Sequence, residues 1–242
     1  TNFTDYDFEG SNLSIIIDAL AYNTYITAYN TNMAANECFL DSATLRENVV
    51  SLARNIGYVP RSRRSSRAKV SFTVSGLTET STLTLNAGIV CNGAGTNTNF
   101  IFCIPEDITV PVVNGFAEFN NIEIYEGNFV SQEFTVDTSL FNQKYILDNS
   151  FIDTSTIKVK VKDSSSSTSS VTYQQIDNII GITSTSAAYL LQEVEDERYE
   201  LIFGDNVIAK KLSNGNVITV SYITTDGRDG NGASEFSFVG NI

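Results

Sequence analysis

The sequence predicts an α+β protein: a pair of N-terminal helices, followed by a small β-sandwich or barrel and then a mixed β-rich domain. Two observations carry this prediction. Apolar residues recur at intervals of three and four up to about residue 57, which is the helical period, and they alternate with polar residues from Ala68 onward. Glycines separate the short alternating runs and mark turns between strands. The predicted divisions are a helical arm over 1–60, a hinge over 61–67, a sandwich or barrel over 68–140 and a second β-rich domain over 141–242.

The first predicted helix is apolar on more than one face. Ser11 is a suitable N-cap, and Leu13, Ile17 and Leu20 follow it at helical spacing. A rotated face carries Ile26, Tyr29 and Met33, with further aromatic bulk from Tyr22 and Tyr25. A helix that is apolar over several stripes is expected to be contacted from several sides.

The second predicted helix begins after Asp41 or Ser42, either of which can cap it, and ends before Gly57. Its apolar residues are spaced by four, three and four, which is the pattern of a bundle seam. Two helices of this length cannot bury all this apolar surface against each other, so the remainder must pack on the β-rich part or on another chain. We expect another chain, because the arginine- and serine-rich stretch 61–67 has the composition of a spacer. The residues expected at this interface are Leu13, Ile17, Leu20, Leu45, Val49, Leu52 and Ile56.

Basic residues gather between the helices and the β-rich part. Five of the 15 basic residues fall between positions 61 and 69, and we expect Arg61, Arg63, Arg64 and Arg67 to belong to a hinge. Two interpretations stay open for this cluster: a surface that meets an acidic partner, or a solvated and flexible spacer.

The β-rich part contains several well-defined alternating runs. Strands are predicted over Ala188 to Glu193, Tyr199 to Phe203 and Val217 to Thr224. Another run alternates Ile157, Val159 and Val161 with three lysines, as in a strand at an exposed sheet edge that is protected by charge. The serine-rich stretch 164–170 is expected to be a loop.

Composition excludes several classes of function. The net charge of −13 argues against nucleic acid or an anionic membrane as a partner, and no apolar run is long enough to span a bilayer. The chain has no histidine, which removes the usual general base and the commonest metal ligand. Its three cysteines show no zinc-site spacing. We therefore expect no enzyme activity, no catalytic residue, no cofactor and no bound metal.

Two other functions remain as alternatives. The acidic run that includes Glu195 and Glu200 suggests a carboxylate-based glycoside hydrolase, although consecutive acids are more often a solvated loop. The serine- and threonine-rich strands suggest a glycan-binding adhesin of a tail or a surface. The glycine-rich stretch from Asp226 to Gly232 does not have the carboxylate positions of an EF-hand calcium loop and is expected to be a turn.

Two stretches of the sequence resemble a known family. The first runs from Asn23 to Asp41 and continues with Leu45 to Val50 and Gly57 to Arg61. The second includes Tyr199 to Asp205, Gly215 to Ile218, Val220 to Tyr222 and Gly227 to Gly232. Together they resemble the baseplate wedge proteins of contractile-tailed bacteriophages within the baseplate J-like family, in particular the wedge subunit of the inner ring. Asn206 departs from the glycine that often follows this Phe-Gly-Asp motif, but asparagine tolerates a left-handed turn. Relatives in this branch continue beyond this point, so a C-terminal part that closes the ring is expected to be missing here.

The resemblance implies a structural role in the virion, at the tail baseplate, after assembly in the host cytoplasm. It implies partners of three kinds: a second copy of the chain and other wedge proteins in a helical bundle, and further baseplate proteins near the tail tube or sheath. The wedges would form the inner ring around the tube, and rearrangement of the ring would trigger sheath contraction.

Overall fold

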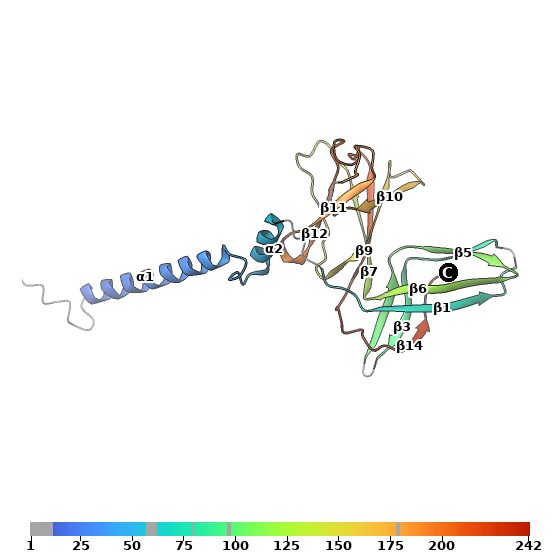
Figure 1. Ribbon diagram of the computed structural model, residues 1–242, viewed down its shortest axis with the longest axis horizontal. Helices are drawn as coiled ribbons and strands as arrows, with labels where there is room; N and C mark the ends of the chain where they lie inside the picture. The colour runs from blue at the N-terminus through green and yellow to red at the C-terminus, as the bar shows by residue number, and fades with distance from the viewer. Residues whose placement is uncertain (1–11, 57–61, 79, 96–97, 178–179) are drawn as a thin grey trace, which may run out of the picture. The chain divides into compact units, whose positions relative to one another are not determined.

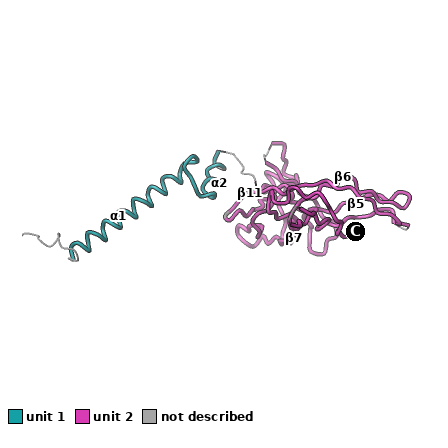
Figure 2. Tube along the Cα trace, turned by 90° about the horizontal axis from the view of Figure 1, so that it is seen from below, with its two compact units in different colours: residues 1–60 teal, residues 61–242 magenta. Residues whose placement is uncertain are grey.

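The computed structural model describes residues 12–56, 62–78, 80–95, 98–177 and 180–242. The chain divides into two compact units, Thr1–Pro60 and Arg61–Ile242, which are coloured separately in Figure 2. The predicted α+β class is confirmed, because two helices precede two extended sheets (Figure 1).

The first unit contains the two predicted helices, α1 (Asn12–Glu37) and α2 (Arg46–Asn55). The helix periodicity therefore predicted both elements, whereas the expected cap Ser11 and the expected terminator Gly57 lie outside the described residues. Neither described helix is long and apolar enough to cross a lipid bilayer. A short loop connects the two helices, with backbone turns at Ser42 and Ala43.

The first sheet has seven strands, and its centre is the long strand β6 (Phe116–Glu126). β6 pairs along its length with β1 (Arg67–Ser75); its end near Glu126 also pairs with β4 (Asn99–Ile104), and its start pairs with β5 (Ile108–Val113). The remaining strands are β2 (Thr82–Leu85), β3 (Gly88–Ala94) and β14 (Glu235–Phe238), and every pairing in this sheet is antiparallel.

The second sheet also has seven strands, in the order β7-β13-β9-β10-β11-β12-β8. It is mixed, as predicted, because β10 and β11 run parallel while all its other neighbours are antiparallel. Its strands are β7 (Asn128–Thr135), β8 (Tyr145–Ile146), β9 (Ile152–Lys162), β10 (Ser170–Gln175), β11 (Ala188–Glu193), β12 (Tyr199–Phe203) and β13 (Val217–Thr224).

The two sheets do not divide at residue 140. β7 precedes the predicted boundary, yet it pairs with β13 of the second sheet over eight registered positions, from Asn128 to Thr135. β14 comes from the end of the chain and pairs with β3 of the first sheet. The predicted boundary therefore does not follow the sheets, because alternation in the sequence identifies a strand but does not identify its partner.

The lysine-bearing strand is not at a sheet edge. β9 directs Val159 and Val161 into the core while its lysines alternate outward, as the period predicts, but it pairs with β13 on one side and with β10 on the other. The prediction of an edge strand was therefore wrong. One lysine has a clear partner, because Lys158 Nζ lies 2.9 Å from Glu106 Oε1 on the turn between β4 and β5.

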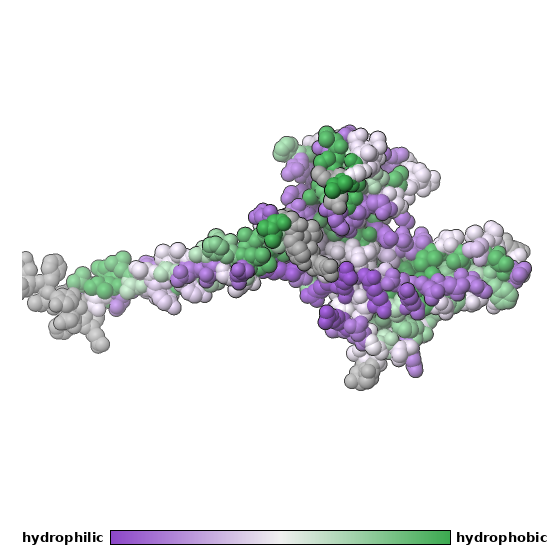
Figure 3. Space-filling view, viewed as in Figure 1, coloured by the Kyte–Doolittle hydropathy of each residue, from purple (hydrophilic) through white to green (hydrophobic). Residues whose placement is uncertain are grey.

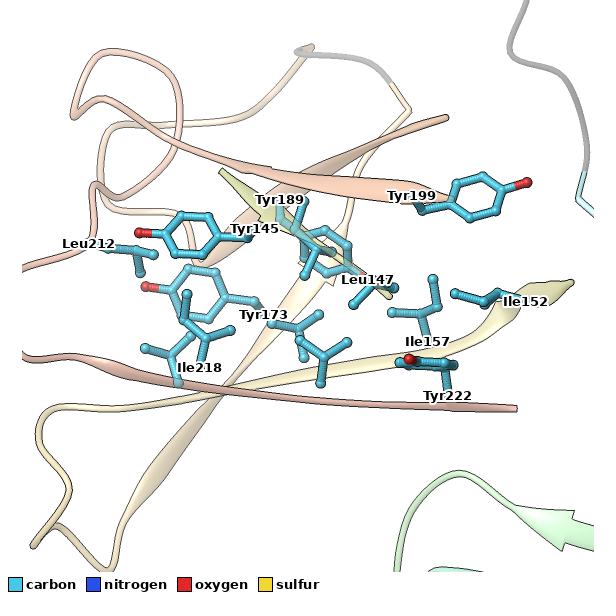
Figure 4. Packing of buried hydrophobic residues seen from close by; sticks show 14 of the residues in the cluster. Tyr145, Leu147, Ile152, Ile157, Tyr173, Tyr189, Tyr199, Leu212, Ile218 and Tyr222 are labelled. Atoms are coloured by element: carbon cyan, nitrogen blue, oxygen red, sulfur yellow. The ribbon is translucent and has the colours of Figure 1, made fainter. Parts of the chain in front are cut away.

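Each sheet encloses its own hydrophobic core. The core of the second sheet is rich in tyrosine, and Figure 4 shows Tyr145, Tyr173 and Tyr189 among its packed side chains. The rings of Tyr145 and Tyr173 both meet Phe203 edge-on, at centroid distances of 5.5 and 5.7 Å. Burying each such side chain contributes about 1.5–3 kcal/mol, and the residues of both cores lie within the β-rich unit.

Candidate assembly surface on the helical arm

The helix α1 buries nothing within the chain. None of its 26 residues is buried. Its large apolar side chains are exposed instead, among them Ile17 at 50%, Leu20 at 60% and Tyr29 at 55%. The space-filling view shows apolar patches over this helix (Figure 3). An exposed apolar surface of this kind is typical of a surface that packs against another protein.

Most apolar residues of α1, together with three threonines, lie on two faces, and all of the residues named below are exposed except Leu13 and Ile26, which are half-buried. Successive residues of an α-helix are 100° apart, so the two sets of residues named next lie on opposite sides of α1. The first, which we call the Leu13 face, carries Leu13, Ile17, Leu20, Thr24, Thr27 and Thr31. The second, the Tyr29 face, carries Ile15, Tyr22, Ile26, Tyr29 and Met33. The Leu13 face keeps an alternating spacing of four and three throughout, and the Tyr29 face keeps it from Tyr22 onward, which lets a second helix pack along each of them.

The two faces differ in shape. The Leu13 face begins with large aliphatic side chains and continues with threonines beside Ala28, which leaves a shallow groove of ≈ 490 Å³ along that part of the helix. The hydroxyls of Thr24 and Thr31 donate to the carbonyls of Leu20 and Thr27, each at 2.8 Å. Because these hydroxyls are satisfied inside the helix, the groove is less polar than its threonines suggest. The sequence analysis missed this half of the face because threonine is a polar residue type.

The helix α2 contributes less of the predicted seam. Val50 and Ala53 are its buried residues, and both follow a predicted seam residue by one position, which places them about 100° around the helix. Leu45 and Ile56 are exposed at 59% and 72%, while Val49 and Leu52 are half-buried. The predicted residues of α2 therefore border its buried face, and only the outer two are fully available to a partner.

The start of α2 is capped by a residue that the sequence analysis did not identify. The carboxylate of Glu37, at the end of α1, accepts hydrogen bonds from Thr44 N, Leu45 N and Asn48 Nδ2. Hydrogen bonds from the side chains of Asn48 and Thr44 and from the Thr44 backbone lower the pKa of Glu37 to about 2. The expected caps Asp41 and Ser42 lie in the turn before this point, so that prediction was wrong. Glu37 thus fixes the corner between the two helices.

The predicted hinge is bound to the β-rich unit over its described part. The Arg63 guanidinium lies 3.9 Å from the centre of the Phe151 ring, and its Nε lies 3.6 Å from Glu197 Oε2. Arg67 opens β1 and lies 3.6 Å from Glu123. Arg64 is exposed, and Arg61 lies outside the described residues. A freely flexible spacer over residues 62–67 does not agree with these contacts.

The described residues offer little for catalysis. They contain no group of three or more side chains suited to hold a metal ion. Burial raises the pKa of the Cys91 thiol, and it raises that of Cys103 to about 11, so neither is a ready nucleophile. A cavity of ≈ 640 Å³ beside β8 and β12 contains Asp137 and Glu200, but hydrogen bonds from Ser139 lower the pKa of Asp137, the opposite of what a general acid needs. The side chain of Glu195 is not described.

The turn that carries the family motif has the geometry expected for it. Asn206 adopts a left-handed backbone, with φ of 72°, as its tolerance for this region predicts. The carboxylate of Asp205 accepts hydrogen bonds from Val207 N and Ile208 N, each at 2.9 Å, and these lower its pKa. A side chain at Gly204 would collide with the backbone of Ala209, so the motif closes a tight turn after β12.

Two comparisons with known proteins agree with one another. Residues 1–58, which contain α1 and α2, match the family model described as baseplate wedge protein gp6-like, helical domain. The chain is also 28% identical over 254 aligned residues to baseplate wedge protein gp6 of Enterobacteria phage T4. That alignment covers 98% of this chain but only 37% of the T4 protein. The matched helical domain and the nearly complete alignment show that this chain is similar to the gp6-type baseplate wedge proteins of phages, and it spans only about a third of the length of the T4 protein.

Proposed function

We propose that this chain is a structural subunit of a contractile-tail baseplate wedge. In this role it assembles the inner baseplate ring around the tail tube and passes on the conformational change that triggers sheath contraction. Its place is the virion, after assembly in the host cytoplasm. The support comes from the gp6-type match together with a helical arm that has unpaired apolar surface.

One observation carries the proposal: α1 presents apolar residues on two opposite faces and buries none of them within the chain. One partner helix can cover only one face. We therefore propose that α1 lies between two neighbouring helices, one from a second copy of this chain and one from another wedge protein. Several large side chains at about 1.5–3 kcal/mol each are enough to offset the free-energy cost of association.

The proposal is tested by placing one charge on each face. Leu20→Asp alters the Leu13 face and Tyr29→Asp alters the Tyr29 face, and both residues are exposed in the chain, so neither change disturbs its own folding. Asn30→Asp is the matched control, because Asn30 lies between the two faces and is polar already. Each chain is co-expressed with the other wedge proteins, and the complexes are separated by size-exclusion chromatography with light scattering.

We expect each face variant to lose one kind of neighbour while the control assembles normally. Leu52→Asp, at the half-buried edge of α2, is expected to block wedge assembly while the β-rich unit stays folded, as circular dichroism can show. Wild-type stoichiometry and yield from Leu20→Asp and Tyr29→Asp together would rule out α1 as the bundle-forming element.

A further inference from the structure

The segment that follows the helical arm is fixed to the β-rich unit by polar contacts. We call residues Ser62–Ser66 the strap. The Ser62 hydroxyl lies 2.8 Å from Thr154 Oγ1 and accepts a hydrogen bond from Thr154 N at 3.0 Å. Ser65 N donates to Asp153 Oδ2 at 2.9 Å, and both residues are buried. The strap is therefore bound along its length, with Arg63 stacked on Phe151 between these two points.

A second group of residues, of which Glu126 and Thr225 are buried, holds the end of the strap. Glu126 N donates to the carbonyl of Ser66 at 2.8 Å, and the Ser66 hydroxyl donates to the carbonyl of Gly227 at 3.0 Å. The carboxylate of Glu126 accepts a 2.6 Å hydrogen bond from the Thr225 hydroxyl, which in turn accepts one from Gly227 N at 2.9 Å. We call Glu126, Thr225 and Gly227 the clasp.

The glycine-rich turn closes over the clasp. A Cβ atom added at Gly230 would lie 2.6 Å from Glu126 Cγ and 3.2 Å from Ser66 Cβ. Only a glycine allows the turn to come this close to both the strap and the clasp. The stretch from Asp226 to Gly232, which the sequence predicts only as a turn, therefore packs over the strap and the clasp.

The strap is held where the two sheets meet. Glu126 is the last residue of β6 in the first sheet, while Asp153 lies at the start of β9 in the second sheet. Thr225 directly follows β13, the neighbour of β9. One short segment is thus bound to both sheets at once, through the buried residues Ser65 and Ser66 and the half-buried Ser62, and each of these contacts would lose a hydrogen bond on release.

We propose that the strap and the clasp form a latch. While the latch is closed, the start of β1 and both sheets are held as one body, and a force applied to the strap is transmitted to both sheets. When the Glu126–Thr225 bond opens, the strap is released from both sheets. The inference does not depend on the identity of the assembly, because it rests on contacts inside residues 62–230.

Amide hydrogen exchange on the whole chain tests the latch. In the wild type we expect the amides of Ser65 and Glu126 to exchange at least about tenfold more slowly than those of the serine-rich loop 164–170, since their acceptors are buried. Thr225→Val keeps the shape of the side chain but removes the bond to Glu126. It is expected to speed exchange at the strap and at Glu126 by about tenfold or more while the β9 and β13 amides stay unchanged.

Ser65→Ala is the matched control on the strap itself. The Ser65 hydroxyl is buried and has no hydrogen-bond partner in the described part of the chain, so its removal leaves every contact of the latch in place. We expect wild-type exchange from this variant. Fast exchange of the strap amides in the wild type, or no change in Thr225→Val, would overturn the latch.

A spin label at position 64 provides a second measurement of whether the strap is held. It tests the latch even if Thr225→Val also speeds amide exchange in β9 and β13. Arg64→Cys is combined with Cys38→Ser, because Cys38 is exposed whereas Cys91 and Cys103 are buried. The nitroxide spectrum is expected to show restricted motion in this background. Ser62→Ala and Arg63→Ala are then added, because they remove strap contacts without altering either sheet. We expect the label to become mobile in this variant. A label that is equally mobile with and without these two substitutions would exclude the latch.

Discussion

At the scale of single residues, two glutamates show how the same side chain serves opposite purposes. Glu37 is surrounded by hydrogen-bond donors that favour its charged form. Glu126 is buried, with Asp226 and Asp229 nearby, and burial followed by these charges raises its pKa, although the Thr225 hydrogen bond opposes the shift. The carboxylate of Glu37 fixes the corner between two helices. The carboxylate of Glu126 accepts a hydrogen bond between the sheets in a buried position that disfavours its charged form.

The pH dependence of the helical arm follows from Glu37. Because its folded pKa is depressed to about 2, its contribution to stability is present above the unfolded pKa of about 4.5 and is lost as the pH falls towards 2. Glu37→Gln is expected to lower the helicity of the arm at pH 7 and to leave it unchanged at pH 2. Circular dichroism of the chain over this range measures the effect, and equal helicity of both proteins at pH 7 would contradict it.

Glu126 predicts the opposite dependence. Its folded pKa is raised, so the stability that this group contributes is fully present below the unfolded pKa and is lost as the pH rises through the folded pKa. Glu126→Gln, which mimics the protonated form, is expected to match the wild type near pH 4 and to equal or exceed it in unfolding midpoint at pH 7. Thermal unfolding at the two pH values is the measurement. A variant that loses midpoint only at pH 7 would show that the charged form is the stabilising one.

At the scale of elements, the sequence predicted those features that depend on local period. Strands β11, β12 and β13 have the bounds that alternation predicts, and both helices were identified. What local period cannot predict is partnership. The pairing of β7 with β13 and of β14 with β3 joins residues far apart in the chain. The capping of α2 by Glu37 spans only seven to eleven positions, but it crosses the corner between two helices, where the helical period stops. The large apolar residues of α1 could be predicted as interface candidates, because the helical period that reveals them is a local feature of the sequence. The identity of the neighbour that covers them is not a local feature and stays a prediction.

The crossing between the sheets depends on one glycine. Gly127 joins β6 to β7 with φ of +130°, and a Cβ there would collide with the carbonyl of Thr224. Gly127→Ala is expected to destabilise the β-rich unit by about 3 kcal/mol or more, through both the backbone strain and the collision. Gly76→Ala is the control, since Gly76 also has a positive φ, +84°, but open space around it, and it is expected to cost about 1 kcal/mol. Urea unfolding compares the two; equal losses would mean that the collision at Gly127 is relieved.

At the scale of the whole β-rich unit, the chain closes on itself. It leaves the first sheet at Gly127, builds the second sheet, and returns to the first sheet as β14. On return, Phe236 packs edge-on against Phe102 at 5.1 Å and Phe238 lies 4.8 Å from Phe72. The Ser221 hydroxyl also donates to the carbonyl of Pro105 at 2.8 Å, which joins β13 to the turn after β4. The two sheets are therefore connected at more than one place along the chain.

This closure predicts that residues 61–242 unfold in one step. A chain that stops at residue 140, the boundary that alternation suggested, keeps β7 but removes its partner β13, and it also removes β14 from the edge of β3. We therefore expect the fragment 61–140 to lack dispersed amide signals in NMR spectra, whereas 61–242 gives a folded spectrum. Urea unfolding of 61–242, followed by far-ultraviolet circular dichroism and by tyrosine fluorescence, is expected to show coincident transitions. A folded fragment, or two separate transitions, would show that the sheets are independent and that the crossing strands only tether them.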